Sequence, residues 1–124
     1  MHFSTAGADF AWDPEARLIK VHFRRMQETT MLEREAAARA IRAWTREGPY
    51  GVLADGEGVG ETAPGALAFW AGFFRLSRAP VHIAVVGFPA EQERALRAWE
   101  ARYGLRLRAF ASAGDALAWL SAPA

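Results

Sequence analysis

The segment 66–74 is long enough for more than two helical turns and contains no charged residue. A helix at the surface of a globular protein normally has a polar face, so a helix that is apolar all round must be buried on two sides. We therefore expect this segment to lie beneath other elements of the chain or against a partner molecule. It follows a short apolar run, 50–54, and a glycine-rich loop whose charges are all acidic.

Strand-like and helix-like segments alternate along the rest of the chain. Asp13 and Pro14 are typical of a type I turn, and they predict a hairpin between a strand at 10–12 and a return strand at 18–24. The return strand has a period of two, which indicates one buried face and one exposed face. Its apolar positions are Ile19, Val21 and Phe23, and its polar positions are Lys20, His22 and Arg24.

Capping signals and glycine or proline stops predict the remaining elements. Thr30 with Glu33, and Ser112 with Asp115, have the spacing of a capping box at a helix start. The predicted helices are 30–46, 64–76, 90–103 and 116–120, and the further predicted strands are 50–54, 81–87 and 105–110. Strands that alternate with helices favour a parallel sheet. The predicted fold is thus α/β, a mixed, mostly parallel sheet with an N-terminal antiparallel hairpin strand at one edge and four helices.

Composition narrows the function classes. The 124 residues suit one domain, 1–124, and the net charge of +1 gives no field that would gather nucleic acid. The absence of cysteine excludes disulfides and thiolate metal sites. No apolar run approaches the roughly 20 residues of a membrane span, and the first residues lack the pattern of a signal peptide. We expect a soluble, cytoplasmic protein without a membrane span.

The loop 55–62 resembles two known kinds of site, a nucleotide-binding turn and a phospho-acceptor site, but neither is supported by the rest of the sequence. Gly56, Gly58 and Gly60 resemble a phosphate-binding turn, but the acidic residues around them would repel a nucleotide. Asp55 ends a predicted strand, as the phospho-acceptor of a receiver domain does, but no acidic pair ends an earlier strand to hold magnesium.

No catalytic, metal or cofactor site is predicted. The three histidines have no metal-ligand spacing, and no serine lies in a nucleophile elbow. His82 lies in an apolar strand and is expected to be a hydrogen-bonded core histidine. An enzyme would require folding to bring together side chains that are far apart in sequence, such as Asp9, His22, Asp55 and His82.

The order of these segments resembles the STAS domain, the family named after sulfate transporters and anti-sigma-factor antagonists. The resemblance rests on the hairpin, the helix that stops at Gly48, the strand 50–55 with its loop and helix, and the segments 82–87 and 110–120. These last segments are similar to the sporulation-protein-AA-like single-domain branch. The resemblance implies a regulatory module whose loop after the central strand carries a phosphorylated serine or threonine. Here Thr62 is the loop's one hydroxyl and is expected to cap a helix, so the resemblance implies a member without the switch.

The leading hypothesis is therefore a non-enzymatic protein-interaction module that binds a protein partner or a second copy of itself as a homodimer. Its predicted interaction loop holds Asp55, Glu57, Glu61 and Thr62, and its predicted interaction helix, 64–76, holds Phe69, Trp70, Phe73 and Phe74. An uncharged, aromatic surface is typical of an interface core. The alternative is a carrier of a small apolar ligand or lipid, in which the same aromatic side chains would line a pocket.

Overall fold

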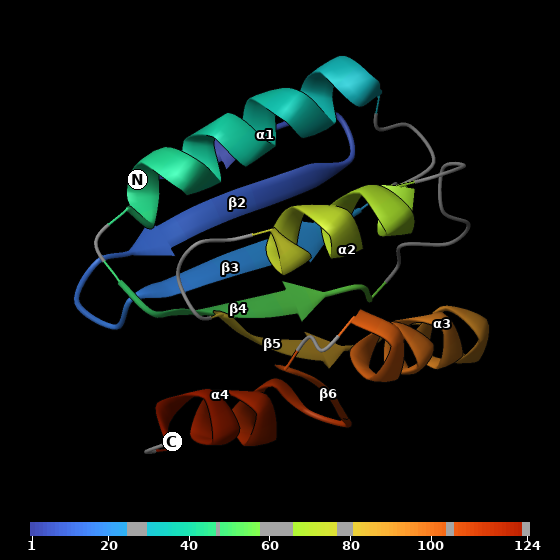
Figure 1. The fold of residues 1–124 in the computed structure, drawn as a ribbon. Helices are drawn as coiled ribbons and strands as arrows, with labels where there is room; N and C mark the ends of the chain where they lie inside the picture. Colours follow the sequence, from blue (N-terminus) through green and yellow to red (C-terminus); the bar gives the residue numbers. More distant parts are fainter. Residues whose placement is uncertain (25–29, 47, 58–65, 77–80, 104–105, 123–124) are drawn as a thin grey trace.

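Six strands pair in the order of the sequence to form one mixed sheet (Figure 1). The computed structural model describes the whole chain except residues 25–29, 47, 58–65, 77–80, 104–105 and 123–124, and the side chains of residues 66, 67, 99 and 103. The strands are β1 (His2–Ser4), β2 (Ala8–Asp13), β3 (Leu18–Phe23), β4 (Tyr50–Asp55), β5 (Val81–Val86) and β6 (Arg106–Phe110). The helices are α1 (Met31–Trp44), α2 (Ala66–Arg75), α3 (Ala90–Tyr103) and α4 (Ala113–Ser121).

The first three strands pair antiparallel and the last four pair parallel, so the predicted fold class is confirmed. The predicted position of the first strand is wrong. The strand around residues 10–12 is β2, and it lies inside the sheet because β1 pairs with it, with Phe3 opposite Phe10. The segment His2–Ser4 is too short to show a period of two, so only its pairing with β2 makes it a strand.

The alternation in β3 separates two layers, as predicted. Ile19, Val21 and Phe23 are buried on the face that α1, α2 and α3 cover (Figure 1), and most of the core lies there. A second, smaller core forms on the opposite face, where α4 packs against Leu18, Leu53 and Ala84. The strand β4 is covered on both faces, which explains its unbroken apolar run.

The helix α2, whose one charged residue is Arg75 at its end, packs with its aromatic side against the sheet, between α1 and α3 (Figure 1). Its residues Trp70 and Phe74 are buried, and the Trp70 ring lies 5.7 Å from the ring of Phe10 on β2. Phe69 and Phe73 are partly buried, and guanidinium groups from α1 lie over their rings. The cations beside these two rings therefore belong to a neighbouring helix.

Both predicted N-caps are present, each through the hydrogen bond that the N-cap side chain accepts. The Thr30 side chain accepts the Glu33 N–H at 3.2 Å, and the Ser112 side chain accepts the Asp115 N–H at 3.2 Å. The helix α4 begins directly after Ser112, three residues earlier than the predicted helix 116–120. Arg34 on α1 is buried, although it is charged.

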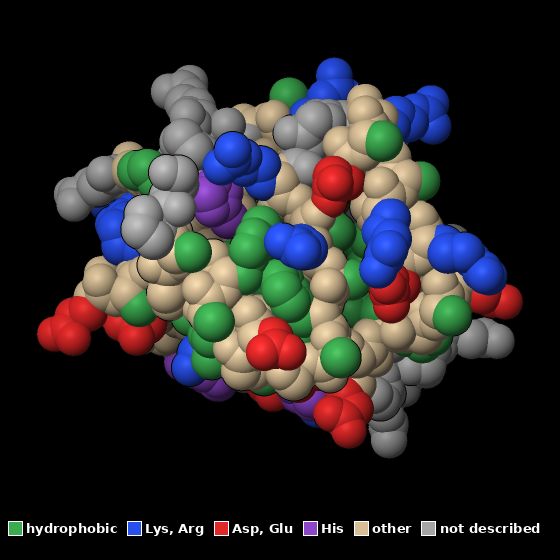
Figure 2. All heavy atoms as spheres, turned by 90° about the horizontal axis from the view of Figure 1, so that it is seen from below, with side chains coloured by type: hydrophobic (Ala, Val, Ile, Leu, Met, Phe, Trp, Pro, Cys, Tyr) green, Lys and Arg blue, Asp and Glu red, His purple; other side chains and the backbone are tan. Residues whose placement is uncertain are grey.

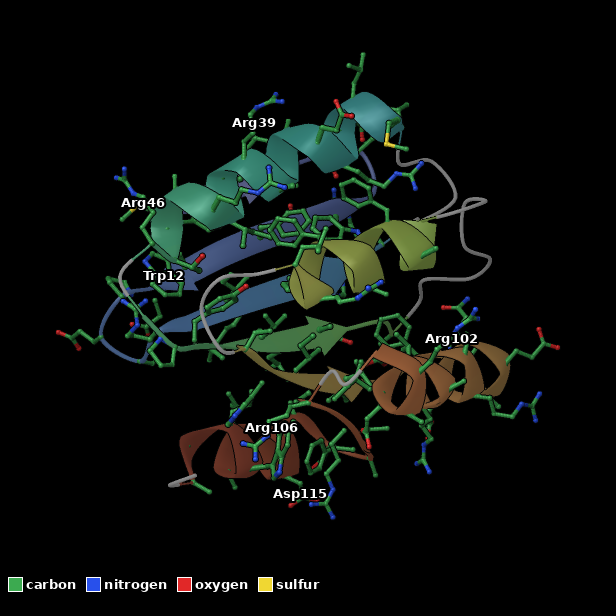
Figure 3. All side chains as sticks on the ribbon, in the orientation of Figure 1. Trp12, Arg39, Arg46, Arg102, Arg106 and Asp115 are labelled. Carbon is green, nitrogen blue, oxygen red and sulfur yellow. The ribbon has the colours of Figure 1, made fainter. Side chains whose placement is uncertain are left out.

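The surface carries both signs of charge. Seen from the side of α3, β6 and α4, hydrophobic side chains gather in the middle of the face, with acidic and basic side chains scattered around them (Figure 2). The exposed residues Arg39 and Arg46 extend outward from the α1 segment (Figure 3). Among the residues that the structure describes, no helix has the length and apolar character needed to cross a bilayer.

Candidate functional site

The helix α4 covers only part of its face of the sheet. It packs on β4, β5 and β6 and reaches Leu18 at the start of β3, and no described helix covers the same face of β1, of β2 or of the rest of β3 (Figure 1). We call the uncovered part the open face. Strand alternation aims Ser4, Asp9, Lys20 and His22 at it. Lys20 and His22 are exposed there.

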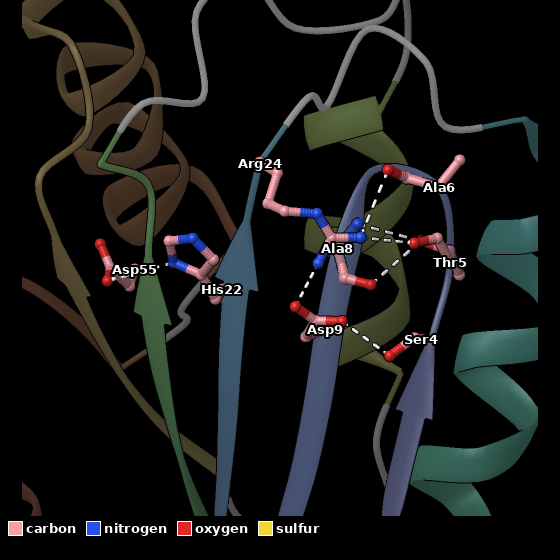
Figure 4. Close-up of polar contacts among 8 residues, drawn as sticks. All are labelled: Ser4, Thr5, Ala6, Ala8, Asp9, His22, Arg24 and Asp55. Carbon is pink, nitrogen blue, oxygen red and sulfur yellow. Dashed lines mark hydrogen bonds and ion pairs between the residues drawn. The ribbon is translucent and has the colours of Figure 1, made fainter.

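Asp9 is the centre of one polar group on the open face (Figure 4). The Ser4 hydroxyl donates to Asp9 Oδ1 at 2.6 Å, and Arg24 Nη1 forms an ion pair with Asp9 Oδ2. Arg24 also donates through Nη2 to the carbonyl oxygen of Thr5 at 2.8 Å, which holds its guanidinium in place. Hydrogen bonds from Ser4 and then Arg24 lower the pKa of Asp9, although desolvation opposes them.

His22 and Asp55 form the second polar group. Asp55 pairs with His22 across the parallel strands, and its Oδ2 lies 3.3 Å from His22 Nδ1 (Figure 4). An acceptor beside Nδ1 favours the tautomer with its proton there, so the neutral ring presents Nε2 as the acceptor. The other Asp55 oxygen, Oδ1, accepts the Glu57 N–H at 2.9 Å.

Two glycines fix the turn that follows Asp55. The Gly56 N–H donates to the Val86 carbonyl at 2.8 Å, and a Cβ on Gly56 would lie 2.6 Å from the Phe88 ring. Gly87 has a φ of +75°, and a Cβ there would lie 3.0 Å from the Glu57 nitrogen. The turns after β4 and β5 are therefore in close contact, which holds Asp55 next to His22.

The open face is hollowed between the two polar groups. A depression of about 250 Å³ lies there, lined by Asp9, Ala11, Lys20, His22, Leu53 and Asp55. Ala11 and Leu53 are the strand partners of Lys20 on its two sides. The floor of the depression is therefore apolar and its rim is charged, as in many protein interfaces.

The hydrogen bonds of this cluster do not form a catalytic triad. A carboxylate that orients a histidine is one part of a catalytic triad, but the hydroxyl of Ser4 donates to Asp9 and not to His22. The cluster therefore lacks the nucleophile–base hydrogen bond of that mechanism. Among the described residues, no group of three side chains has the arrangement needed to hold a metal ion.

Folding brings together only part of the set that the enzyme hypothesis required. Asp9, His22 and Asp55 lie on three adjacent strands, with His22 in the middle. His82 lies elsewhere, beneath α4, where its Nε2 is 2.9 Å from Arg106 Nη1 and its ring packs on Trp119. The predicted hydrogen bond of His82 is present, but the ring is half-buried rather than fully in the core.

The predicted interaction residues are distributed differently. Asp55 lies on the open face and Glu57 is exposed in the turn after it, whereas Glu61 and Thr62 lie outside the described residues. The four aromatic residues predicted for the interaction helix pack within the chain's own core or at its border, and at most parts of two rings reach the surface. They are Phe69, Trp70, Phe73 and Phe74.

Sequence reasoning did not assign Ser4, Ala11, Lys20 or Arg24 to a site. The signal for two of them was present, since the period of two in β3 places Lys20 and Arg24 on the same face as His22. What the pattern could not supply was the register with β2, which brings Asp9 opposite His22 and Ala11 opposite Lys20.

A separate, wholly apolar void lies in the core between the sheet and the helices α2 and α3. It measures about 50 Å³ and is lined by residues that include Phe10, Trp70, Phe74 and Leu96. Ligand pockets for small molecules start at about 300 Å³. A lipid carrier would therefore need this part of the core to open.

Comparison of the chain with protein-family models, curated proteins and solved structures finds no match. The resemblance to the STAS domain therefore stays a prediction.

Proposed function

We propose that the chain is a non-enzymatic, STAS-like regulatory module that binds a protein partner on the open face of its sheet. The observation that carries the proposal is the incomplete cover of that face: α4 packs on β4, β5 and β6 and leaves the polar groups of β1, β2 and β3 exposed. A cytoplasmic location is part of the proposal.

The size of the depression supports a protein partner over a small molecule. Its volume of about 250 Å³ is below the range of about 300–1,000 Å³ that encloses drug-sized ligands. It suits one side chain that protrudes from a partner surface. The acidic turn Asp55–Glu57 borders the same face, so this part of the predicted interaction loop remains in the proposal.

The proposed surface for the partner does not include the aromatic side of α2. Trp70 is 8% exposed and Phe74 is 9% exposed, so neither can meet a partner while α2 stays on the sheet. The exposed part of α2 includes Ala68 and Arg75, and this face is not aromatic.

Site-specific photo-cross-linking tests the proposal. A photoreactive amino acid at position 2 would lie on the open face, because His2 is exposed and pairs with Ala11. The same amino acid at position 43, on the exposed side of α1, is the matched control. We expect a defined protein, or a second copy of this chain, to cross-link from position 2 but not from position 43.

A second substitution checks that the captured protein occupies the depression. Ala11→Arg would fill it with a guanidinium and should abolish the cross-link, whereas Ala43→Arg should leave it unchanged. Equal capture from both positions, or capture that survives Ala11→Arg, would refute docking on the open face.

A further inference from the structure

The void between the sheet and the helices α2 and α3 is lined only by apolar groups. The described residues around it come from the strands β2 to β6, from both helices and from the turn at Phe88, and none of their polar atoms faces it. Its volume of about 50 Å³ exceeds the roughly 10–15 Å³ that one water needs, but a buried water also needs about two to four polar partners. The void therefore has room for a small molecule and no group that would hold water.

An apolar atom in the void would restore contacts that its walls lack. Protein interiors contain few spaces larger than a water, and side chains that face an empty space lose dispersion attraction on that side. Rings in mutual contact hold these walls apart: the Trp70 ring centroid lies 5.7 Å from that of Phe10 and 6.0 Å from that of Phe74. A guest without polar groups would gain these contacts and would lose no hydrogen bond to the protein.

Phe88 is the one described lining residue that is only partly buried. Its ring lies 6.1 Å from the ring of Phe23, and it occupies the space beside Gly56, where an added Cβ would be 2.6 Å away. A guest enters a void most directly past a side chain that reaches the surface. A change in the rotamer of Phe88 would therefore open the shortest route into the core.

We propose that the void is a binding site for one small apolar molecule without hydrogen-bonding groups, and that Phe88 is its gate. An engineered apolar cavity of about 150 Å³ in another protein stays dry and takes up benzene or xenon. A void of about a third of that volume suits a compact guest such as a single xenon atom and is too small for an acyl chain. The void lies in the main core, on the side of the sheet opposite the open face, so this inference does not depend on docking there.

Xenon is the probe, because it is compact and has no polar group. NMR spectra of protein with ¹³C-labelled methyl groups are recorded under increasing xenon pressure. We expect saturable shifts of the methyl signals of Val52, Ile83 and Leu96, which line the void. The methyl signals of Leu18 and Leu120 in the second core should not shift, and the same pressure of helium controls for compression.

Two substitutions test the site and the gate separately. Ala54→Val adds two methyl groups to the lining and should abolish the saturable shifts, whereas Ala109→Val, at the border of the same core but outside the lining, should leave them unchanged. Phe88→Leu replaces the ring by a smaller side chain and should speed the exchange of bound xenon severalfold. Saturation transfer between free and bound ¹²⁹Xe measures this rate.

Each part of the inference has its own contrary result. Shifts that rise with pressure without saturation, or that are as large in the second core, would refute the site, and this wild-type titration decides the matter even if Ala54→Val does not fold. Saturable shifts that survive in folded Ala54→Val would place the guest elsewhere, and an unchanged exchange rate in Phe88→Leu would refute the gate. Because the xenon experiment needs no partner and the cross-linking experiment needs no guest, either proposal can fail without the other.

Discussion

Two carboxylates flank His22 on neighbouring strands, and their hydrogen bonds give them different roles. Asp9 is held by Ser4 and Arg24, which are both close to the first hairpin. Asp55 is held by its own turn, through the Glu57 N–H, and by His22 on the adjacent strand. Asp9, on β2, therefore links Ser4 on β1 to Arg24, which directly follows β3. Asp55 links its own turn to His22 on the open face.

Replacement of Asp9 by asparagine should destabilise the fold in a pH-dependent way. Because the folded-state pKa of Asp9 is lowered, its contribution is complete above the ordinary carboxyl pKa and is lost as the pH falls through the folded value. Asp9→Asn should cost at most about 1 kcal/mol at pH 7, since the pair is more than a third exposed, and less at pH 2. Urea unfolding at both pH values measures this, with Glu100→Gln on α3 as control. A cost that does not change with pH would contradict it.

A methyl group added at Gly56 should lower the stability of the fold, whereas one added at Gly72 should raise it. Gly56→Ala places its Cβ 2.6 Å from the Phe88 ring and should cost about 1–3 kcal/mol through overpacking. Gly72 lies within α2 with nothing within 4 Å of the added Cβ, so Gly72→Ala should stabilise the protein by about 0.5–1 kcal/mol. Thermal unfolding of both variants is the measurement. If Gly56→Ala is neutral, the two turns are not fixed by this contact.

Residue types alone could not have predicted the open-face cluster. The sequence shows that Lys20, His22 and Arg24 share a face, because alternation is a local property. Asp9 and Asp55 reach that face only through strand register, which depends on pairings between residues up to 33 positions apart. A shift of one residue would turn each side chain to the other face.

In the contact between α1 and α2, arginine side chains of α1 lie over aromatic rings of α2. Arg34 and Arg42 lie eight positions apart on α1, and their guanidinium groups lie 5.7 Å and 5.0 Å from the ring centroids of Phe69 and Phe73. A guanidinium over an aromatic face is attracted by the ring quadrupole. The apolar side of α2 is thus bordered by cations without a charge in its own sequence from residue 66 to residue 74.

A double-mutant cycle should detect this contact. Arg42→Ala combined with Phe73→Leu should give a coupling of about 0.5–1 kcal/mol in the free energy of unfolding, because removal of either partner already abolishes the interaction. Arg39 extends outward from α1, and Arg39→Ala with Phe73→Leu should give no coupling (Figure 3). Equal coupling in both cycles would mean that the helix surface, and not the ring contact, is responsible.

Elements with a strong local signal were predictable, and those that depend on distant pairing were not. Thr30 and Ser112 mark helix starts in the sequence, because each side chain accepts a hydrogen bond from an N–H three residues later. By contrast, β1 exists because it pairs with β2, and its three residues carry no pattern. The burial of Arg34 likewise depends on Phe69, which lies on another helix.

The whole molecule is organised around the aromatic contacts that join α2 to the sheet. Trp70 lies within ring-contact distance of Phe10 on β2 and of three phenylalanines in its own helix. Large side chains at this junction fill the space between the helical layer and the sheet. The aromatic content of the chain is thereby explained by packing, whatever the open face binds.

Trp70→Ala should therefore cost about 3–5 kcal/mol, a large part of the stability of a domain this size. Leu76, which follows α2 and is 77% exposed, is the control, and Leu76→Ala should change stability by no more than about 0.5 kcal/mol. Urea unfolding and light scattering of both variants check this. A small loss of stability for Trp70→Ala, together with a change of oligomeric state for Leu76→Ala, would contradict this and would indicate that α2 forms an interface with another molecule.

The sequential strand order has a consequence for how the chain is made. Every strand pairs with the strand synthesised just before it, so the growing sheet does not wait for a distant partner to leave the ribosome. The exception is the second face, because the helix that covers Leu53 and Ala84 follows all six strands in the sequence. Until α4 forms, the sheet keeps a bare apolar strip on this face, at Leu53 and Ala84.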